Sequence, residues 1–172
     1  MSTPLLTVDN LRVTYRVGRR RVAAVKGVSF SVARGQCLGI VGESGSGKSS
    51  LARAILALEP AATGQVIFAG EDVLKMSRAA RQVFRRRAQM VFQDPLGSLN
   101  PRLKIGAALA EVLRVHGLAR NRREAAAQTA AWLATVGLDA EYATRFPHEL
   151  SGGQRQRVNL ARALCVGAEF LV

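Results

Sequence analysis

The 172-residue sequence has few cysteines, few aromatic residues and few acidic residues. Its two cysteines, Cys37 and Cys165, cannot form a disulfide framework and have no paired metal-binding spacing. We expect both to be buried free thiols in a reducing compartment. Aromatic residues make up only 5% of the chain, which disfavours a protein that stacks single-stranded nucleic acid on its rings.

Long hydrophobic runs are also missing, although 48% of the residues are hydrophobic. No uninterrupted apolar run approaches the ~18 residues of a membrane-spanning helix. The first twenty residues lack the cationic start and apolar core of a signal peptide. The sequence therefore predicts a cytosolic chain, or one held at a membrane through a partner. Its length suits about one domain with its own core.

Negative charge is scarce, since 25 Lys and Arg face 12 Asp and Glu and give a formal net charge of +13. Such an excess is compatible with nucleic acid or with an anionic membrane face. The basic residues are scattered, however, with short clusters only at Arg19–Arg21 and Arg85–Arg87. We expect no nucleic-acid partner, and we interpret Arg85–Arg87 as a solvated helix end.

The first half of the chain predicts strands that alternate with helices. The run Cys37–Val41 is apolar throughout, which is typical of a strand buried on both faces of a parallel sheet. The helix that follows should place Leu51, Ile55 and Leu58 on one face. The other expected elements are strands at residues 5–17, 28–32, 64–68 and 89–92 and a helix at residues 77–87.

The second half reads as mainly helical. A loop carries Pro95, Gly97 and Pro101, and helices are expected at residues 105–115 and 121–136. Asn121 and Glu124 have the spacing of a capping box, and Ala126, Ala130 and Leu133 are expected to face the core. A final helix should begin near Ser151 and bury Val158, Ala161 and Leu164. An apolar run, Phe170–Val172, follows as the start of a strand.

The strongest chemical signal is the segment GESGSGKS at residues 42–49. It matches the pattern G-x-x-x-x-G-K-[ST] between an apolar run and a helix. Glycines allow backbone N–H groups to surround a phosphate, and a helix N-terminus adds positive potential. Lys48 can reach the β- and γ-phosphates, and Ser49 can ligate Mg²⁺. The expected nucleotide-binding residues are Gly42, Glu43, Ser44, Gly45, Ser46, Gly47, Lys48, Ser49 and Ser50, although Ser50 could instead simply face solvent.

A second signal is LSGGQRQR at residues 150–157. Ser151 and Gln154 have the S-x-x-Q spacing of a helix N-cap. Gly152 and Gly153 are poor helix formers, and they make sense if a ligand must approach the first N–H groups closely. The sequence therefore predicts two separate anion-binding helix starts.

Together these two motifs resemble the ATP-binding subunit of ABC transporters. The segments VFQDPLGSLNPR (91–102) and RFPHELSGGQRQRVNLARAL (145–164) are similar to the branch that imports oligopeptides, dipeptides and nickel. The resemblance implies an α/β P-loop NTPase (RecA-like) core with an antiparallel β subdomain and a helical insert. It implies a single nucleotide-binding domain: an ATP-binding core at 1–92, a helical subdomain with the signature motif at 93–157, and a return to the core at 158–172.

The resemblance also implies roles for single residues. Lys48 and Gln93 would take part in catalysis, Ser49 and Gln93 would contact Mg²⁺, and Tyr15 would stack on adenine. Ser151, Gly152, Gly153 and Gln154 would contact an ATP held by the opposite ATPase subunit. Tyr15 could instead be a half-buried strand residue, and Gln93 an ordinary polar residue at a strand end. Asp94 is rejected as a metal ligand, and His116 and His148 are interpreted as packing or solvent residues.

The implied partners are transmembrane permease subunits, a second ATPase subunit that is a copy or a paralogue, and, indirectly, a solute-binding protein. The implied location is peripheral, at the cytoplasmic face of the inner membrane. ATP hydrolysis would drive import of a small solute, with peptides the favoured class and nickel and glutathione open. The alternatives are a non-transport ATPase of this type that acts on DNA or ribosomes, motivated by the charge, and a regulatory fragment without catalysis.

The end of the sequence departs from the family pattern. Members of the family continue after the signature helix with a strand that ends in Asp-Glu, and the Glu polarises the attacking water. This sequence ends at Val172, inside the corresponding apolar run. The resemblance therefore implies an incomplete C-terminus: the full-length form would be an ATPase, and the chain as written, without that Glu, would not turn over ATP.

Overall fold

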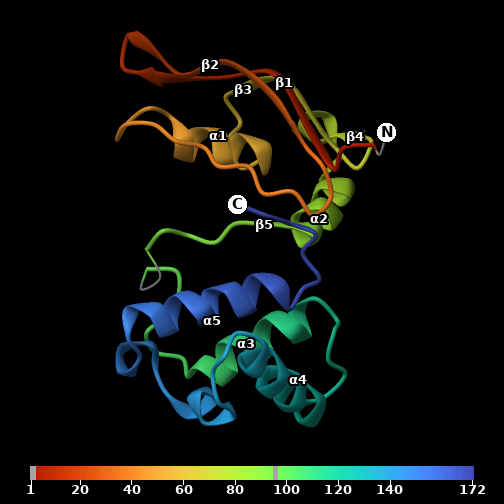
Figure 1. Ribbon diagram of the computed structural model, residues 1–172, viewed down its shortest axis with the longest axis vertical. Helices are drawn as coiled ribbons and strands as arrows, with labels where there is room; N and C mark the ends of the chain where they lie inside the picture. Colours follow the sequence, from red (N-terminus) through yellow and green to blue (C-terminus); the bar gives the residue numbers. More distant parts are fainter. Residues whose placement is uncertain (1–2, 95–96) are drawn as a thin grey trace. The chain divides into compact units, whose positions relative to one another are not determined.

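The structure is a computed structural model that describes residues 3–94 and 97–172. The chain divides into two compact units, residues 1–85 (unit 1) and 86–172 (unit 2), which are described separately (Figure 1). Pro95, expected in a loop, lies outside the described residues. Within the described ranges, no helix has both the length and the apolar character needed to cross a membrane.

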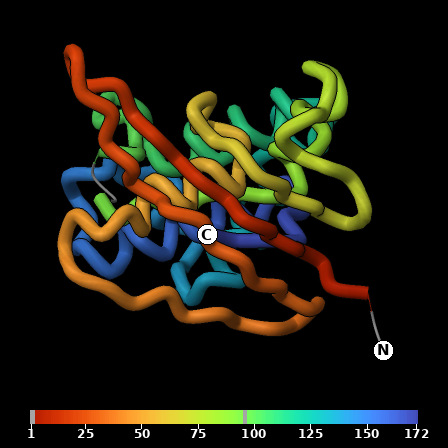
Figure 2. The backbone as a smooth tube through the Cα atoms, turned by 90° about the horizontal axis from the view of Figure 1, so that it is seen from above, coloured from red at the N-terminus to blue at the C-terminus, as the bar shows by residue number. Residues whose placement is uncertain are grey.

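Unit 1 is built on an antiparallel sheet of four strands in the order β2-β1-β3-β4. The strands are β1 (Leu6–Val17), β2 (Arg20–Val32), β3 (Ala62–Phe68) and β4 (Glu71–Asp72). Figure 2 shows β1 and β2 side by side in red and orange. The second strand is much longer than the predicted 28–32, because its pairing with β1 continues to Val17 and Arg20 beside the turn.

A β-bulge in β1 decides which residues reach the core of unit 1. Leu6 and Val8 are buried before it, and Leu11 and Val13 are buried after it, so the buried positions change from even to odd. The register shifts between Val8 and Leu11, where Asn10 has a φ of 43°. An extra residue in one strand turns the following side chains to the other face, so the bulge keeps apolar residues inward along the strand.

The apolar run Cys37–Val41 is not a strand in this structure, and that prediction is wrong for the described residues. Figure 2 shows residues 33–47 as a wide loop between β2 and α1. Val41 is 97% exposed, and Cys37 is exposed rather than buried as expected. A fully apolar strand depends on neighbours that supply its hydrogen bonds and cover it. None of the described strands pairs with this run.

The helix α1 (Lys48–Ile55) follows the glycine-rich segment and packs against β1 and β2. Leu51 and Ile55 are buried as predicted, but Leu58 is 44% exposed and lies beyond the helix end. The reason is local: Leu56 is the C-cap, and Ala57 turns the chain with a φ of 51°. A short 3-10 helix, η1 (Val73–Lys75), and the predicted helix α2 (Arg78–Arg87) follow the sheet.

Unit 2 is mainly helical, with one short parallel strand pair. The pair consists of β5 (Ala88–Gln89) and β6 (Phe170–Leu171), so the predicted strand at 89–92 is reduced to two residues. The helices are α3 (Ile105–Val115), α4 (Arg122–Thr135) and α5 (Gly152–Leu164), with 3-10 helices η2 (Ala140–Thr144) and η3 (Pro147–Glu149) before α5. The bounds of α3 and α4 and the start of α5 agree with the sequence-based expectation to within one residue, whereas the two 3-10 helices were not predicted.

The buried face of α4 differs from the predicted one. Ala125, Thr129 and Leu133 point inward, whereas Ala126 is exposed and Ala130 is half-buried. An alanine-rich helix has almost the same hydrophobicity on every side, so its sequence alone does not identify the buried face. In α5, Val158 and Ala161 are buried as expected, but Leu164 is only half-buried. The main core of unit 2 contains Leu99, Ile105, Leu109, Leu133, Leu138, Leu150, Val158 and Ala161.

Two of the three arginines of the basic cluster at the end of α2, Arg86 and Arg87, are anchored rather than solvated, which corrects the prediction for these two, whereas Arg85 is exposed. Arg87 forms an ion pair with Glu169, with Nε 2.5 Å from Oε1. Arg86 Nε donates to the carbonyl of Val166 at 3.0 Å. These contacts connect the start of unit 2 to the segment that leads into β6.

Candidate functional site

The glycine-rich segment of unit 1 forms a loop that enters α1 through Gly47. Gly45 and Gly47 have φ values of 80° and 95°, in the left-handed region that favours glycine. A Cβ atom on Gly47 would lie 2.1 Å from the carbonyl oxygen of Ala24 in β2. The position therefore requires glycine for two reasons, backbone conformation and close approach to β2.

Lys48 folds back over the same loop. Its ammonium donates to the carbonyl oxygens of Gly42 at 2.7 Å and Glu43 at 2.6 Å, and to Ser46 Oγ at 3.2 Å. None of the described side chains caps the N-terminus of α1, and its first turn carries no acidic residue. The loop, the helix N-terminus and Lys48 therefore present positive potential in one place, which suits a phosphate.

Tyr15 is brought to the same helix by hydrogen bonds. Its hydroxyl donates to Glu59 Oε2 at 2.8 Å and lies 3.0 Å from Ser50 Oγ. Glu59 also accepts from the backbone N–H of Ala61 at 3.1 Å. Sequence reasoning did not find Glu59, since nothing in its local pattern marks it. Ser50 is the third residue of α1, which begins at Lys48. Its hydroxyl is directed toward Tyr15 and does not simply face solvent, which was the other possibility.

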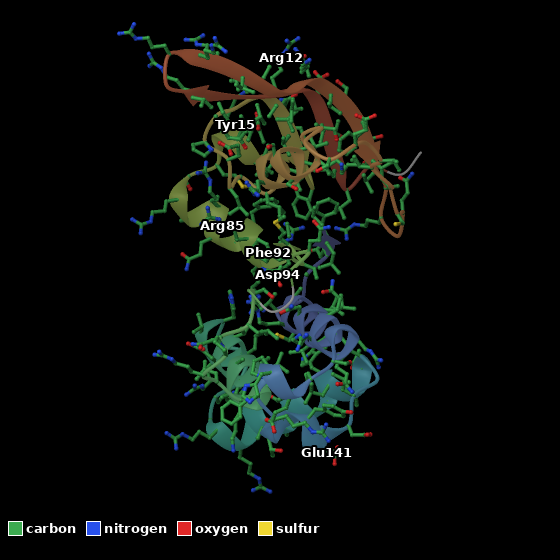
Figure 3. All side chains as sticks on the ribbon, turned by 90° about the vertical axis from the view of Figure 1, so that its left-hand side faces the viewer. Arg12, Tyr15, Arg85, Phe92, Asp94 and Glu141 are labelled. Carbon is green, nitrogen blue, oxygen red and sulfur yellow. The ribbon has the colours of Figure 1, made fainter. Side chains whose placement is uncertain are left out.

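Gln93 and Asp94 belong to unit 2 and follow β5 as exposed residues. Figure 3 labels Asp94 and also Phe92, the residue before Gln93, and the Phe92 side chain is 46% exposed. No three His, Cys, Asp or Glu side chains of the described part of the chain gather closely enough to hold a metal ion. A divalent cation here would need oxygen ligands from a bound phosphate, together with hydroxyl or amide oxygens of the protein.

The second motif forms a closed capping box at the start of α5. Ser151 Oγ accepts from the N–H of Gln154 at 3.3 Å, and Gln154 Oε1 accepts from the N–H of Ser151 at 2.8 Å. Gln154 Nε2 also donates to the Tyr142 hydroxyl at 2.9 Å. Arg155 donates to the carbonyl oxygens of Pro147 and Leu150, at 3.3 and 2.6 Å. Tyr142 and Arg155 support this helix start, and the sequence did not predict that role for either residue. Of the two, only Arg155 lies within the motif at residues 150–157.

No steric contact among the described residues requires glycine at the two glycine positions of this motif. A Cβ atom on Gly152 or on Gly153 would meet no atom within 4 Å, and neither residue has a positive φ. Both are exposed at the first turn of α5. Small residues at an exposed, positively polarised helix start leave room for an external group to approach the backbone.

The remaining residues are packing or surface residues. His148 stacks on Phe146 with ring centroids 5.6 Å apart, and His116 is the exposed C-cap of α3. Trp132 packs against the core of unit 2. Burial raises the pKa of the Cys165 thiol to about 11, which keeps this cysteine neutral and unreactive near pH 7.

Comparison with known proteins gives consistent matches. The family model described as "ABC transporter" matches residues 25–172. The chain is 45% identical to the oligopeptide transport ATP-binding protein OppF of Bacillus subtilis (strain 168), over 100% of this chain and 57% of OppF. It is 46% identical to the glutathione import ATP-binding protein GsiA of Escherichia coli (strain K12), over 98% of this chain and 28% of GsiA. It thus spans about half the length of the oligopeptide transport relatives it matches.

Solved structures match over nearly the whole chain. The ATP-binding cassette MJ0796, solved as a dimer in a post-hydrolysis state with ADP and phosphate, superposes with a TM-score of 0.83 at 28% identity. That match covers 96% of this chain and 72% of the cassette. The protein cbiO1 of Clostridium perfringens superposes with a TM-score of 0.79 at 23% identity, covering 99% of this chain and 64% of cbiO1, which is a likeness of fold alone.

Proposed function

Since this chain belongs to the ABC transporter family and has its α/β P-loop fold, we propose that it is the ATP-binding part of an importer. ATP hydrolysis in the complete protein would drive a small solute, peptides foremost, through a membrane permease. The observation that carries the proposal is the phosphate cradle of unit 1: Gly47 against β2, Lys48 over the loop carbonyls, and the first turn of α1.

The proposed ATP contacts follow from the geometry of that cradle. Lys48 would exchange its bonds to the loop carbonyls for bonds to phosphate, and the loop N–H groups would donate to phosphate oxygens. Tyr15, fixed through Glu59 and Ser50, would offer its ring to the adenine. The residues proposed to contact this ATP are Tyr15, Gly42, Glu43, Ser44, Gly45, Ser46, Gly47, Lys48, Ser49 and Ser50.

We propose Mg²⁺ as the accompanying ion. Ser49 offers a hydroxyl on the first turn of α1, and Gln93 offers an exposed amide oxygen after β5. Hydroxyl and amide oxygens together with phosphate oxygens are hard ligands that suit this ion. When bound, Mg²⁺ would neutralise the charge that develops on the phosphate oxygens. The role of Gln93 in catalysis is part of the same proposal.

The signature segment Ser151–Gln154 is proposed to contact an ATP held by a second ATPase subunit. The support is the open space in front of Gly152 and Gly153 and the closed capping box that holds the helix start rigid. The dimeric state described for MJ0796 agrees with such pairing in that relative.

The further partners are proposed from the relatives. Their names describe import and transport of oligopeptides and glutathione, which favours permease subunits and a solute-binding protein over DNA or ribosomes. We place the protein at the cytoplasmic face of the cell membrane as a peripheral subunit. The proposed domain arrangement keeps residues 1–92 as ATP-binding core, 93–157 as helical subdomain and 158–172 as a return to the core.

Substitution of Lys48 tests the nucleotide site. In Lys48→Ala the affinity for MgATP should fall about tenfold to hundredfold, because a charge-assisted hydrogen bond is worth roughly 1.5–3 kcal/mol. Isothermal titration calorimetry measures it. Lys75→Ala is the matched control, since Lys75 is a mostly exposed lysine of the same unit whose partner is Asp72. Equal affinities of wild type and Lys48→Ala would contradict the assignment.

A further inference from the structure

A long stretch of unit 1 carries charge of one sign. From Asn10 to Gly42 the sequence contains no Asp or Glu. The same stretch contains seven cations: Arg12, Arg16, Arg19, Arg20, Arg21, Lys26 and Arg34. Six of them, all but Arg34, lie on the β1–β2 hairpin and are exposed. The proposed nucleotide site uses none of these six side chains.

The register of the hairpin places like charges directly opposite each other. Arg16 pairs with Arg21, and Arg12 pairs with Lys26. Like charges at directly opposed positions destabilise a strand pair, so stability alone favours a carboxylate at one position of each pair. Two such pairs in one hairpin indicate a surface that is completed by an external anion.

Four of the cations lie on the outer face of the hairpin: Arg12, Arg16, Arg21 and Lys26. Arg19 lies in the turn at the tip, and Arg20 pairs with Val17 on the face that carries Tyr15. The opposite face buries Leu11, Val13 and Val25 in the core of unit 1. Figure 3 shows Arg12 on the side that points away from this core and Tyr15 on the other side. The hairpin has two aromatic rings, Tyr15 and Phe30. Tyr15 is engaged with Glu59 and Ser50, and Phe30 pairs with Val8, whose side chain is buried. The outer face therefore offers cations without the aromatic platform that single-stranded nucleic acid prefers.

Two valines add an apolar component at the hairpin tip. Val17 is 64% exposed and Val22 is 49% exposed, and they bracket the tip of the hairpin, where Arg19 lies in the turn and Arg20 and Arg21 begin β2. Apolar side chains surrounded by arginine are typical of segments that lie in the headgroup region of a membrane. A bilayer is also broad enough to meet the cations of the tip together with those that continue along the outer face.

We propose that the tip and the outer face of the β1–β2 hairpin bind anionic phospholipid headgroups, with Val17 and Val22 of the tip at the acyl boundary. The membrane location rests on the proposed function, whereas the charge, register and exposure of the hairpin do not. The contact would hold the ATPase subunit at the bilayer in addition to its contact with the permease.

Vesicle sedimentation tests the proposal. The purified protein should partition onto phosphatidylcholine vesicles that contain about one-third phosphatidylglycerol, and far less onto pure phosphatidylcholine. The variant Arg19→Gln/Arg20→Gln/Arg21→Gln should lower the partition coefficient about a hundredfold, since each basic residue near an anionic surface contributes about fivefold. Val17→Ser/Val22→Ser should weaken binding to the same vesicles without any change of charge.

The matched control is Arg120→Gln/Arg122→Gln/Arg123→Gln. It removes the same charge from three exposed arginines around the start of α4 in unit 2, and it should leave vesicle binding at the wild-type level. Equal losses in the two triple variants, or wild-type binding by the hairpin variant, would overturn the proposal. So would binding of polyglutamate or duplex RNA by the hairpin without binding to vesicles, which would indicate an acidic polypeptide or a nucleic acid.

MgATP affinity, measured by calorimetry in every variant, separates this proposal from the proposed function. Wild-type MgATP affinity in the hairpin variant, with loss of vesicle binding, supports the lipid site by itself. Failure of the wild-type protein to bind MgATP would contradict the nucleotide assignment and leave the vesicle result unaffected.

Discussion

Glycine serves opposite purposes in the two phosphate-type motifs. Gly47 is required by the fold itself, because a Cβ atom there would collide with the carbonyl of Ala24 and its φ is 95°. Gly152 and Gly153 have normal backbone conformation and open space around them. The first glycine therefore shapes the loop, while the other two leave a surface free. This difference makes the second motif testable without unfolding the protein.

Gly153→Asp should separate ATP binding from subunit pairing. In the full-length protein it should abolish ATP-dependent dimerisation, because a carboxylate at the first turn of α5 would repel a phosphate. The variant should fold normally, since an acidic residue near a helix N-terminus stabilises the helix by about 0.3–1 kcal/mol. Light scattering with MgATP reports dimerisation, and calorimetry reports the affinity of the single subunit.

Gln156→Asp is the control for this variant, because it adds the same charge to an exposed position of the same helix. It should still dimerise. A drop of single-subunit MgATP affinity in Gly153→Asp would show that both motifs serve one site, contrary to the proposal.

Cys165 should be chemically protected by its surroundings. Burial raises the pKa of its thiol to about 11 from the ordinary value of 9.0. In a Cys37→Ser background, iodoacetamide should modify folded Cys165 at about pH 8 roughly a hundredfold more slowly than the unfolded chain, because the thiolate fraction falls with each pKa unit. Mass spectrometry follows the reaction, and similar rates in both states would contradict the expected burial.

The raised pKa of Cys165 also makes the free energy of unfolding depend on pH. Between about pH 9 and pH 11 the folded state keeps a proton that the unfolded state has lost. The free energy of unfolding should therefore decrease as the pH rises through this window. Below pH 9 both states are protonated and Cys165 contributes no slope.

At the scale of elements, the local sequence of α4 specifies where the helix begins, but it does not specify which face of the helix is buried. Asn121 Oδ1 accepts from the N–H of Glu124 at 2.9 Å, as the spacing predicts. The Glu124 carboxylate accepts from the N–H of Arg120 at 2.8 Å, one residue before the N-cap, so the box is not the regular reciprocal one. Two hydrogen bonds nevertheless set where the helix begins.

Loss of this cap should be measurable. Asn121→Ala should lower stability by about 1 kcal/mol, because an N-cap side chain satisfies an otherwise unpaired helix N–H. Thermal unfolding followed by circular dichroism should then show a midpoint about 2–4 °C lower. Asn121→Ser keeps an acceptor and should stay near the wild-type midpoint. An unchanged midpoint in the alanine variant would mean that core packing alone defines this helix end.

At the scale of the whole molecule, the chemistry is divided between the two units. The phosphate cradle and Tyr15 belong to unit 1, whereas Gln93 and the signature segment belong to unit 2. Each motif is preorganised within its own unit, by Gly47 and Lys48 in one and by the capping box in the other. The net charge of +13 is likewise uneven, with an acid-free stretch along the first hairpin.

The sequence by itself determined the features that depend on near neighbours. The phosphate loop, both N-caps, the helix bounds of the second half and the family resemblance all rest on residues within a few positions of one another. Propensity, capping and glycine conformation act over this range, so they can be read from the order of residues.

Only the tertiary structure decided features that need a distant partner. The sequence did not reveal that Ala125 and Thr129 would form the buried face of α4, that Arg87 would pair with Glu169, or that Glu59 would hold Tyr15. It also predicted a strand at Cys37–Val41, whose formation depends on neighbours that no described strand supplies. Burial, ion pairs and strand pairing are properties of two segments at once, and their energies depend on contacts that are distant in the chain.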